Sequence, residues 1–527
     1  MSHQPNILFI HTDEQRVDSL GCYSNDIVST PHIDGLADDG VTFDEGHCTH
    51  PLCSPSRGTL MTGRYPNSHG TWRNGIPLST EETTIADRLS NAGYQTGLLG
   101  KAHFTPYRGN PEIHPESVQT IAVDEEECWD YWRNFNGPYY GFEHVEMTIA
   151  HGHRSVHGGH YGLWLEENHP EAKPLFQQEA ALDDTYLAVN SWKSAAPLEA
   201  HSSTWVADRT IEFIEQNAGD QPFFGWVGFP DPHFPYDPPE PYCHRYDPEE
   251  VPLPVDPAGE VWEDEDVPQY ITFHLEEKYG IDFRELTEAK QREIIAHTYA
   301  MVDLVDDSVG RILEALEAQG IADDTIIVFT SDHADWLGDH GLFQKGIPHA
   351  RDLTRIPWIV KWPGVNEPGR RVQAPTSQVD LVPTLLDAAG VDIPYGVQGE
   401  SLRPVLTGEQ EALRPFAYVE HRHEAFHEEG MFAQNAREGV GGGLMQDIIS
   451  WGDEDIHVKT VYADGHRFSY VTGVPESYSE LFDLAADPEE MTNLWGEDSD
   501  LERRMFEHLT EALIHAQDPL PEREHPV

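Results

Sequence analysis

Apolar residues along this chain fall into two patterns, short continuous runs and longer stretches with helical spacing. The continuous runs are typical of strands that are buried on both faces. They lie at residues 6–10, 94–99, 223–229 and 325–330. The helical stretches precede three of these runs, at residues 84–92, 205–216 and 295–316, and Gly93 and Gly320 follow the first and the last. Strands that alternate with helices predict an α/β fold with a large, mostly parallel sheet sandwiched by helices.

Charged and imidazole side chains follow each of these predicted strands. They are Asp13, Lys101, His103, His233, Asp332 and His333. In open α/β sheets, ligands bind beyond the carboxyl ends of the strands. We therefore expect these residues to meet in one crevice, although they are far apart in the chain.

The pattern changes near residue 400. Apolar runs at residues 458–462 and 468–471 flank Asp464-Gly465, which is typical of a hairpin turn. One face of a terminal helix is predicted from Leu501, Met505, Leu509 and Leu513. We predict a catalytic α/β domain over residues 1–400 and a smaller C-terminal α+β subdomain with an antiparallel sheet over residues 401–527.

Two stretches of the first domain are predicted to be inserted loops that cover the crevice and select the substrate. Residues 105–200 lack clear periodicity, and residues 235–290 are acidic and rich in proline. Histidines 151, 153, 157 and 160 lie in the first stretch. They are expected to belong to a solvated loop, with a pocket lining or a second metal site as the alternative.

The composition is strongly acidic. Asp and Glu number 93 against 33 Lys and Arg, a net charge of −60. Such a charge repels nucleic acid and anionic membranes, so neither is expected as a partner. Because the charges are spread along the chain, they favour a solvated surface of the kind that halophilic proteins use over a polycationic partner.

The cysteines and the apolar runs bear on the compartment. Five cysteines without paired spacing favour a reducing environment over a disulfide framework. No apolar run is long enough to predict a membrane span, and residues 1–5 have neither the basic region nor the apolar core of a signal peptide. We predict a cytoplasmic protein.

The segment Cys53-Ser54-Pro55-Ser56-Arg57-Gly58-Thr59-Leu60-Met61-Thr62-Gly63-Arg64 is the most informative part of the chain. Ser54 and Pro55 suit the first positions of a helix, so Cys53 is expected just before a helix N-terminus, which favours anions. A cysteine alone would be interpreted as a buried structural residue. The whole segment, however, resembles the signature of the type I sulfatases, a family of the alkaline phosphatase superfamily.

The resemblance implies a modification, a metal and a reaction together. In this family the cysteine is oxidised to formylglycine by a formylglycine-generating or sulfatase-maturing enzyme, and the hydrated aldehyde is the nucleophile. The implied metal ligands are Asp13, Glu14, Asp332, His333 and Cys53 as formylglycine. Glu14 stands where most members have a second aspartate, and His333 stands where asparagine is frequent. Carboxylates suit Ca²⁺ or Mg²⁺, whereas imidazole shifts the preference towards Mn²⁺. The resemblance implies Ca²⁺ first, with Mn²⁺ and Mg²⁺ as alternatives.

The resemblance also implies a sulfate pocket. Its residues lie in Gly100-Lys101-Ala102-His103, Asp231-Pro232-His233-Phe234-Pro235 and Gln344-Lys345-Gly346. Lys101 and Lys345 are expected to bind the sulfate oxygens, and His233 to bind substrate and protonate the leaving alcohol. His103 is expected to act as the base that completes turnover, and Arg57 to steady the formylglycine oxygens. The resemblance extends from about residue 5 to residue 510.

The predicted function is hydrolysis of the sulfate monoester of a small molecule or saccharide to an alcohol and inorganic sulfate, by an arylsulfatase-like sulfuric ester hydrolase. One alternative is a phosphonate monoester or phosphodiester hydrolase of the same superfamily, which the His333 pattern favours. Another is a non-catalytic protein that binds sulfated ligands. The sequence leaves the alcohol part of the substrate and the oligomeric state open.

Overall fold

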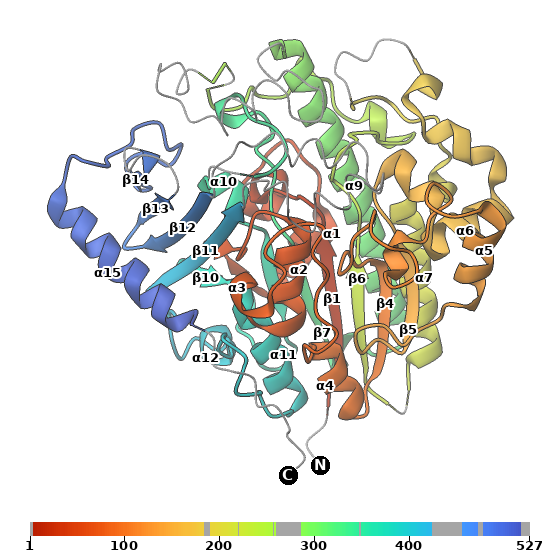
Figure 1. Cartoon of the computed structure of the whole chain (residues 1–527), viewed down its shortest axis with the longest axis horizontal. Helices are drawn as coiled ribbons and strands as arrows, with labels where there is room; N and C mark the ends of the chain where they lie inside the picture. Colours follow the sequence, from red (N-terminus) through yellow and green to blue (C-terminus); the bar gives the residue numbers. More distant parts are fainter. Residues whose placement is uncertain are drawn as a thin grey trace.

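An eight-stranded sheet forms the centre of the part of the chain that the computed structural model describes, namely residues 4–183, 190–219, 221–256, 258–259, 286–346, 349–423, 456–472 and 478–517 (Figure 1). The strand order is β5 (His144–Thr148), β4 (Gln95–Lys101), β6 (Phe223–Gly228), β1 (Asn6–Thr12), β7 (Thr325–Ser331), β8 (Trp358–Lys361), β2 (Val41–Phe43) and β9 (Arg370–Val372). Neighbours from β5 to β7 pair in parallel, whereas β8 is antiparallel to both β7 and β2. The predicted, mostly parallel sheet is confirmed.

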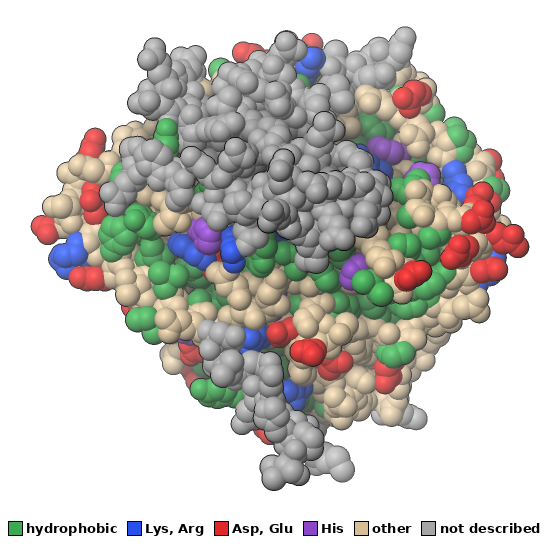
Figure 2. Space-filling model, viewed as in Figure 1, with side chains coloured by type: hydrophobic (Ala, Val, Ile, Leu, Met, Phe, Trp, Pro, Cys, Tyr) green, Lys and Arg blue, Asp and Glu red, His purple; other side chains and the backbone are tan. Residues whose placement is uncertain are grey.

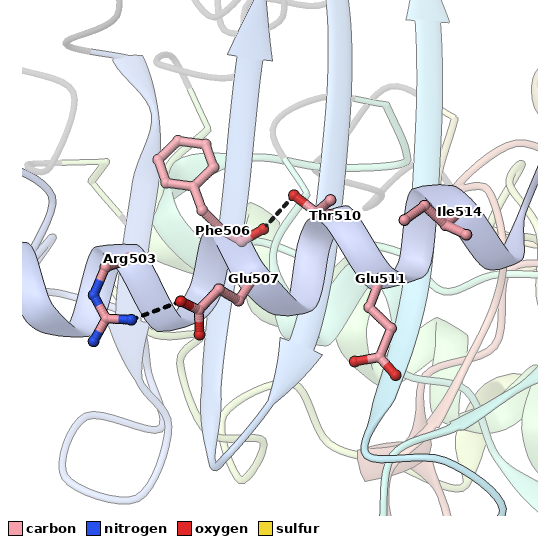
Figure 3. A pocket seen from close by; sticks show the side chains of 6 residues that line it. All are labelled: Arg503, Phe506, Glu507, Thr510, Glu511 and Ile514. Atoms are coloured by element: carbon pink, nitrogen blue, oxygen red, sulfur yellow. Dashed lines mark hydrogen bonds and ion pairs between the residues drawn. The ribbon is translucent and has the colours of Figure 1, made fainter.

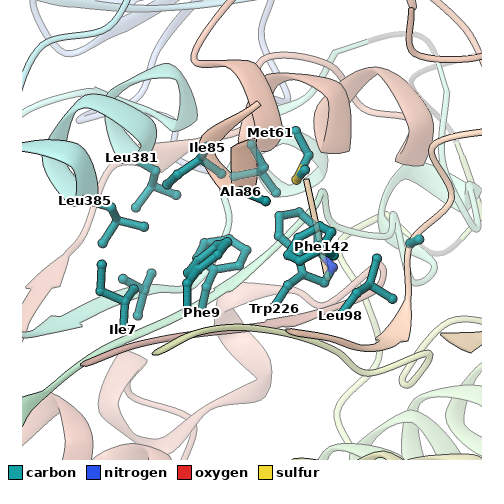
Figure 4. Close-up of a cluster of buried hydrophobic side chains, with 14 of the residues drawn as sticks. Ile7, Phe9, Met61, Ile85, Ala86, Leu98, Phe142, Trp226, Leu381 and Leu385 are labelled. Carbon is teal, nitrogen blue, oxygen red and sulfur yellow. The ribbon is translucent and has the colours of Figure 1, made fainter. Parts of the chain in front are cut away.

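Both faces of the sheet are covered by helices, and β1 shows how the sequence achieves this. Successive side chains of a strand point to opposite faces. Ile7 and Phe9 therefore pack in one apolar cluster, and Leu8 and Ile10 pack in the other. Figure 4 shows Ile7 and Phe9 facing side chains of the covering helices. Burial on both faces explains why the strands appear in the sequence as continuous apolar runs.

The helices divide between these two clusters. The cluster of Leu8 and Ile10 contains apolar residues of α1 (Pro31–Asp39), α6 (Gly159–Asn168), α7 (Ser202–Asn217) and α9 (Glu288–Ala318). The cluster of Ile7 and Phe9 contains those of α2 (Cys53–Thr62), α4 (Ile85–Asn91), α5 (Glu125–Asn134), α11 (Leu381–Ala389) and α12 (Arg403–Leu406). Shorter elements are α3 (Pro66–His69), α10 (Arg351–Thr354) and the paired strands β3 (Gly46–His47) and β10 (Thr376–Ser377).

The predicted helices and strands agree with the structure to within a few residues, except at the start of α9. Helix α4 begins after Thr84, whose Oγ1 accepts a hydrogen bond from the amide of Asp87 (3.1 Å), while the Asp87 carboxylate accepts one from the Thr84 amide (2.9 Å). Helix α9 begins at Glu288, earlier than the predicted residue 295. Residues 288–292 are polar or charged apart from one alanine, so they contribute no apolar spacing.

The prediction that residues 105–200 are an inserted loop is wrong in part, because this stretch contains β5, α5 and α6. Strand β5 pairs with β4 at the edge of the central sheet, and α5 buries Cys128, Trp129 and Trp132. Polar residues break the apolar pattern of these elements: His144 and Glu146 interrupt β5, and α5 begins with three glutamates. Of the second predicted loop, residue 257 and residues 260–285 lie outside the described part of the chain.

The C-terminal part forms an antiparallel sheet beside the central one (Figure 1). Its strands are β11 (Phe416–His423), β12 (Ile456–Ala463), β13 (His466–Thr472) and β14 (Glu480–Asp483), and α15 (Ser499–His515) packs on it. Asp464 and Gly465 both have positive φ (52° and 74°), as the predicted hairpin turn requires. The boundary near residue 400 stays a prediction.

One predicted core position of α15 is wrong. Leu513 is 39% exposed, and Ala512 is buried in its place with Leu501, Met505 and Leu509. Eleven residues from Leu501 make about three full helical turns, which returns Ala512 to the buried face.

On the face that Figure 2 shows, Asp and Glu side chains lie at both margins and along the lower part. No helix among the described residues combines the length and the apolar composition that a membrane span requires.

Candidate active site

The carboxyl ends of β1, β4 and β7 bring together the polar residues that follow them. Asp13 follows β1, Lys101 ends β4, and Asp332 and His333 follow β7. The amide of Asp332 donates to the Thr12 carbonyl (3.2 Å), which ties two of these ends together. All four side chains are buried. The position of β1 next to β7 therefore places residues from distant parts of the sequence in one site, as predicted.

Cys53 is the first residue of α2 and faces this site. The helix begins one residue earlier than predicted, with Leu52 at the N-cap and Ser54 inside the helix. The amide of Ser54 donates to Asn74 Oδ1 (2.9 Å). The Cys53 sulfur lies 3.3 Å from His333 Nε2, 3.3 Å from Lys345 Nζ and 3.7 Å from Asp13 Oδ1. Burial and the charge of Asp13 raise the pKa of the Cys53 thiol. An unmodified Cys53 is thus a neutral thiol and a weak nucleophile.

Four side chains offer donor atoms to a single cation. They are Asp13, Cys53, Asp332 and His333, whose ligand atoms all lie within 4.8 Å of one another. His333 Nδ1 contacts the Ala334 carbonyl (2.9 Å), which can only accept, so Nδ1 carries the proton and the lone pair of Nε2 faces the cluster. Buried carboxylates with an oriented imidazole are a donor set that fits a divalent cation.

Arg57 bridges the two carboxylates of this cluster. Its Nε donates to Asp332 Oδ2 (2.8 Å) and its Nη2 to Asp13 Oδ2 (2.9 Å), and all three side chains are fully buried. Burial opposes ionisation of Asp13, but Lys101 and Arg57 outweigh it and hold the pKa of Asp13 well below its usual range. Arg57 therefore positions Asp13 and Asp332. Its expected contact with the formylglycine oxygens of residue 53 stays a prediction.

Glu14 differs in placement from the other predicted ligands. Its Oε2 lies 2.8 Å from Lys345 Nζ and 3.0 Å from His233 Nε2, and it does not belong to the four-donor cluster. Its Oε1 is buried without a hydrogen bond and is the oxygen that remains for a cation. Burial, opposed by Lys345, raises the pKa of Glu14 to about 8. Its role as a metal ligand stays a prediction.

His151 belongs to the site, so the solvated-loop interpretation is wrong for this residue. Its Nε2 contacts Lys101 Nζ and lies 3.4 Å from Asp13 Oδ2. Its ring stacks on that of His233, with 3.5 Å between the ring centroids and 8° between the planes. His151 follows β5, so the rule that placed the other site residues after strands would have found it if β5 had been recognised.

His103 completes the set of predicted residues. Its ring stacks on Tyr107 with 3.9 Å between centroids and 9° between planes, and its Nδ1 is buried without a hydrogen-bond partner. Burial, then the charges of Lys101 and Arg57, lower the pKa of His103 well below its usual range. The imidazole is therefore neutral and able to accept a proton.

A separate surface hollow lies on α15 and contains none of these residues (Figure 3). It is lined by Arg503, Phe506, Glu507, Thr510, Glu511 and Ile514, and Arg503 pairs with Glu507 (2.6 Å). A hollow built from one exposed helix face offers no convergent catalytic groups.

The family model for sulfatases, described as "Sulfatase", matches residues 5–391. The chain belongs to the sulfatase family. It is 28% identical over 523 residues to an arylsulfatase of Clostridium perfringens, covering 97% of this chain and 94% of that protein. It is 24% identical over 544 residues to an N-acetylglucosamine-6-O-sulfatase of Bacteroides thetaiotaomicron, covering 94% of this chain and 83% of that protein. The family and these relatives identify this sulfatase as a sulfuric ester hydrolase.

A solved structure supports the fold of this sulfatase. The phosphonate monoester hydrolase of Agrobacterium radiobacter superposes with a TM-score of 0.73 and 27% sequence identity, covering 97% of this chain and 95% of that one. The predicted alkaline-phosphatase-like architecture is thereby confirmed, and a phosphonate hydrolase is a structural relative.

Proposed function

We propose that this sulfatase hydrolyses the sulfate monoester of a small molecule or saccharide through a formylglycine made from Cys53 by a maturing enzyme. The observation that carries the proposal is the position of Cys53, at the first residue of α2 and 3.3 Å from both Lys345 Nζ and His333 Nε2. The buried thiol is a weak nucleophile as it stands, which gives the oxidation a chemical reason.

A divalent cation, with Ca²⁺ expected first and Mn²⁺ or Mg²⁺ as alternatives, would be held by Asp13, Asp332 and His333, and it would lower the pKa of a hydroxyl on the hydrated aldehyde. The remaining work falls to side chains of the chain itself. Lys345 faces residue 53 and, with Lys101, supplies positive charge for the sulfate oxygens. Such local charge is needed because the net charge of −60 repels an anionic ester.

Two groups can move protons in this site. His233 Nδ1 contacts the Phe234 carbonyl and so carries a proton, while His233 Nε2 and Glu14 Oε2 face each other at 3.0 Å. A hydrogen bond between those two atoms requires a further proton, which we assign as the one delivered to the leaving alcohol. His103, neutral and with an Nδ1 that has no hydrogen-bond partner, is the base that would accept the proton of the second hydroxyl of residue 53, so that the bond to sulfate breaks, sulfate leaves and the aldehyde returns.

The substrate class follows from the relatives that act on sulfate esters. An arylsulfatase and a sulfatase of N-acetylglucosamine support an aryl or saccharide sulfate as the first substrates to screen. The sparse, free cysteines support action in a reducing compartment, which we propose to be the cytoplasm.

The test is the mass of the peptide that contains Cys53, from protein purified from its native host. Loss of the thiol and gain of an aldehyde are expected. Serine has one hydroxyl where the hydrated aldehyde has two, so Cys53→Ser protein should release at most one leaving alcohol per active site. Unmodified cysteine in fully active protein, or multiple rapid turnovers by Cys53→Ser, would refute the proposal.

Phosphonate monoester hydrolysis is the second candidate function. The structural likeness to a phosphonate monoester hydrolase and the imidazole of His333 in the cation cluster favour it. Steady-state rates on an aryl sulfate and on an aryl phosphonate with the same leaving group separate the two. A higher kcat/KM for the phosphonate would make that activity the principal one.

A further inference from the structure

Glu116 is a buried carboxylate outside the predicted site. It lies in a short 3₁₀ turn, Pro115–Ser117, and its side chain is fully buried. Its Oε2 accepts a hydrogen bond from the amide of His103 (2.7 Å). Its Oε1 accepts from the amides of Phe104 (2.8 Å) and Thr105 (2.9 Å). Three successive backbone donors therefore converge on one side chain.

The backbone at His103 explains this convergence. His103 has φ of +56°, in the left-handed region that residues other than glycine adopt rarely and keep only when surrounding contacts hold them. A left-handed residue next to right-handed or turn residues aims successive amides at one point, a concavity known as a nest, which binds anions. Here the anion is the carboxylate of Glu116, supplied by the chain itself.

The remaining contacts of Glu116 are also hydrogen-bond donors. The Tyr139 hydroxyl (2.8 Å) and the Thr105 hydroxyl (3.3 Å) both reach Oε1. A buried charge is costly unless hydrogen bonds satisfy it. Glutamine would have the same shape, but its amide NH₂ would face a backbone N–H. The donors around residue 116 therefore require the two acceptor oxygens of a carboxylate, and a side chain of the same size is not enough.

The loop that Glu116 binds carries the imidazole of His103 into the active site. Gln119, shortly after Glu116 in the chain, holds Tyr107 in place, because Gln119 Nε2 donates to the Tyr107 carbonyl (2.7 Å). The His103 ring then stacks on Tyr107. The backbone of this loop is thus held at both ends, and the stacking on Tyr107 orients the His103 ring.

We propose that Glu116 is a positioning residue of the sulfatase reaction, which holds the amides of residues 103–105 and so fixes the imidazole of His103. This inference rests on the proposed role of His103 as the base. It assigns to Glu116 no contact with substrate and no proton transfer.

The test is a double-mutant cycle with Glu116→Gln and His103→Ala. Loss of a side chain that orients a functional group typically costs about 10- to 100-fold, so Glu116→Gln should lower kcat by that factor and change KM much less. Because Glu116 acts through His103, Glu116→Gln should lower kcat by less than about twofold in the His103→Ala background. Losses that multiply in the double variant would overturn the proposal.

Two further measurements separate positioning from folding. Tyr139→Phe removes one donor from the same carboxylate but none of the loop amides, so its kcat should stay near that of the wild type. Glu116→Ala empties the nest, and formate should restore part of its kcat where chloride at equal ionic strength does not. Equal effects of formate and chloride would contradict the nest.

The cycle also distinguishes failure of the proposed base role of His103 from failure of the positioning role of Glu116. If His103→Ala retains full kcat, the base assignment in the proposed function fails. If His103→Ala is impaired and Glu116→Gln still adds an independent loss, the positioning role fails while the proposed function stands.

Discussion

Arg57 is the residue whose replacement tests the electrostatic design of the site most directly. In Arg57→Gln, Asp332 loses its 2.8 Å charge-assisted hydrogen bond and Asp13 its 2.9 Å one, while Lys101 still contacts Asp13. All three side chains of the bridge are fully buried, so water cannot replace the guanidinium. Breaking a buried pair in this way costs about 3–5 kcal/mol because a charge is left uncompensated.

The assay is urea unfolding of chelator-treated protein, followed by tryptophan fluorescence, in wild type and Arg57→Gln. The free energy of unfolding should fall by about 3–5 kcal/mol. Arg57→Lys should lose less, because its ammonium keeps the charge but cannot bridge both carboxylates. Addition of Ca²⁺ should raise the stability of Arg57→Gln more than that of the wild type, since a cation can compensate the same carboxylates.

Arg503→Gln is the matched control. Arg503 pairs with Glu507 on α15 at 2.6 Å, but both side chains are more than 60% exposed. Such pairs contribute about 0–1 kcal/mol, so this variant should unfold near the wild-type midpoint. If Arg57→Gln lost no more stability than Arg503→Gln, the reasoning about the buried bridge would be refuted.

Three other predictions follow from burial, charge and placement. Burial lowers the pKa of His69 to about 3, so below pH 6.5 the unfolded chain binds a proton that the folded chain cannot. The free energy of unfolding should therefore decrease as pH falls from 6.5, by about 1.4 kcal/mol per pH unit for this histidine. The variant His69→Gln should show a shallower dependence of unfolding free energy on pH. An unchanged slope would contradict this prediction. The net charge of −60 repels an anionic sulfate ester, and salt screens this repulsion. The kcat/KM for such an ester should therefore rise roughly tenfold between low and high ionic strength. A fall would show that attraction by the lysines of the site dominates. His151→Ala should lower kcat/KM by about 10- to 100-fold because it removes contacts to Lys101 and Asp13. The ring of His153 lies near Trp192 instead, so the control variant His153→Ala should have little effect. Equal losses in the two variants would show that His151 has no specific role.

Local patterns in the amino-acid sequence were enough to predict the alternation of strands and helices and the residues that follow the strands. Both signals are local: a strand buried on two faces needs a continuous apolar run, and a helix needs apolar residues at its own period. Asp13, Lys101, Asp332 and His333 could be predicted as one site because parallel strands of a single sheet end at the same edge. The signature around Cys53 is also a local pattern, and it sufficed to predict the family.

How these side chains share charges and protons depends on the packing of the folded chain. Arg57 bonds to Asp332, and Glu14 to Lys345, across hundreds of residues, and no local pattern specifies which partner a buried charge will find. Strand β5 carries His144 and Glu146 among its apolar residues and so forms no continuous apolar run, which hid the place of His151 after its end. Glu116 was invisible for a related reason, because its function depends on a left-handed backbone at His103 that aims three amides at one point. Local periodicity determines which elements form, whereas the pairing of buried polar groups is determined by the elements that happen to pack around them.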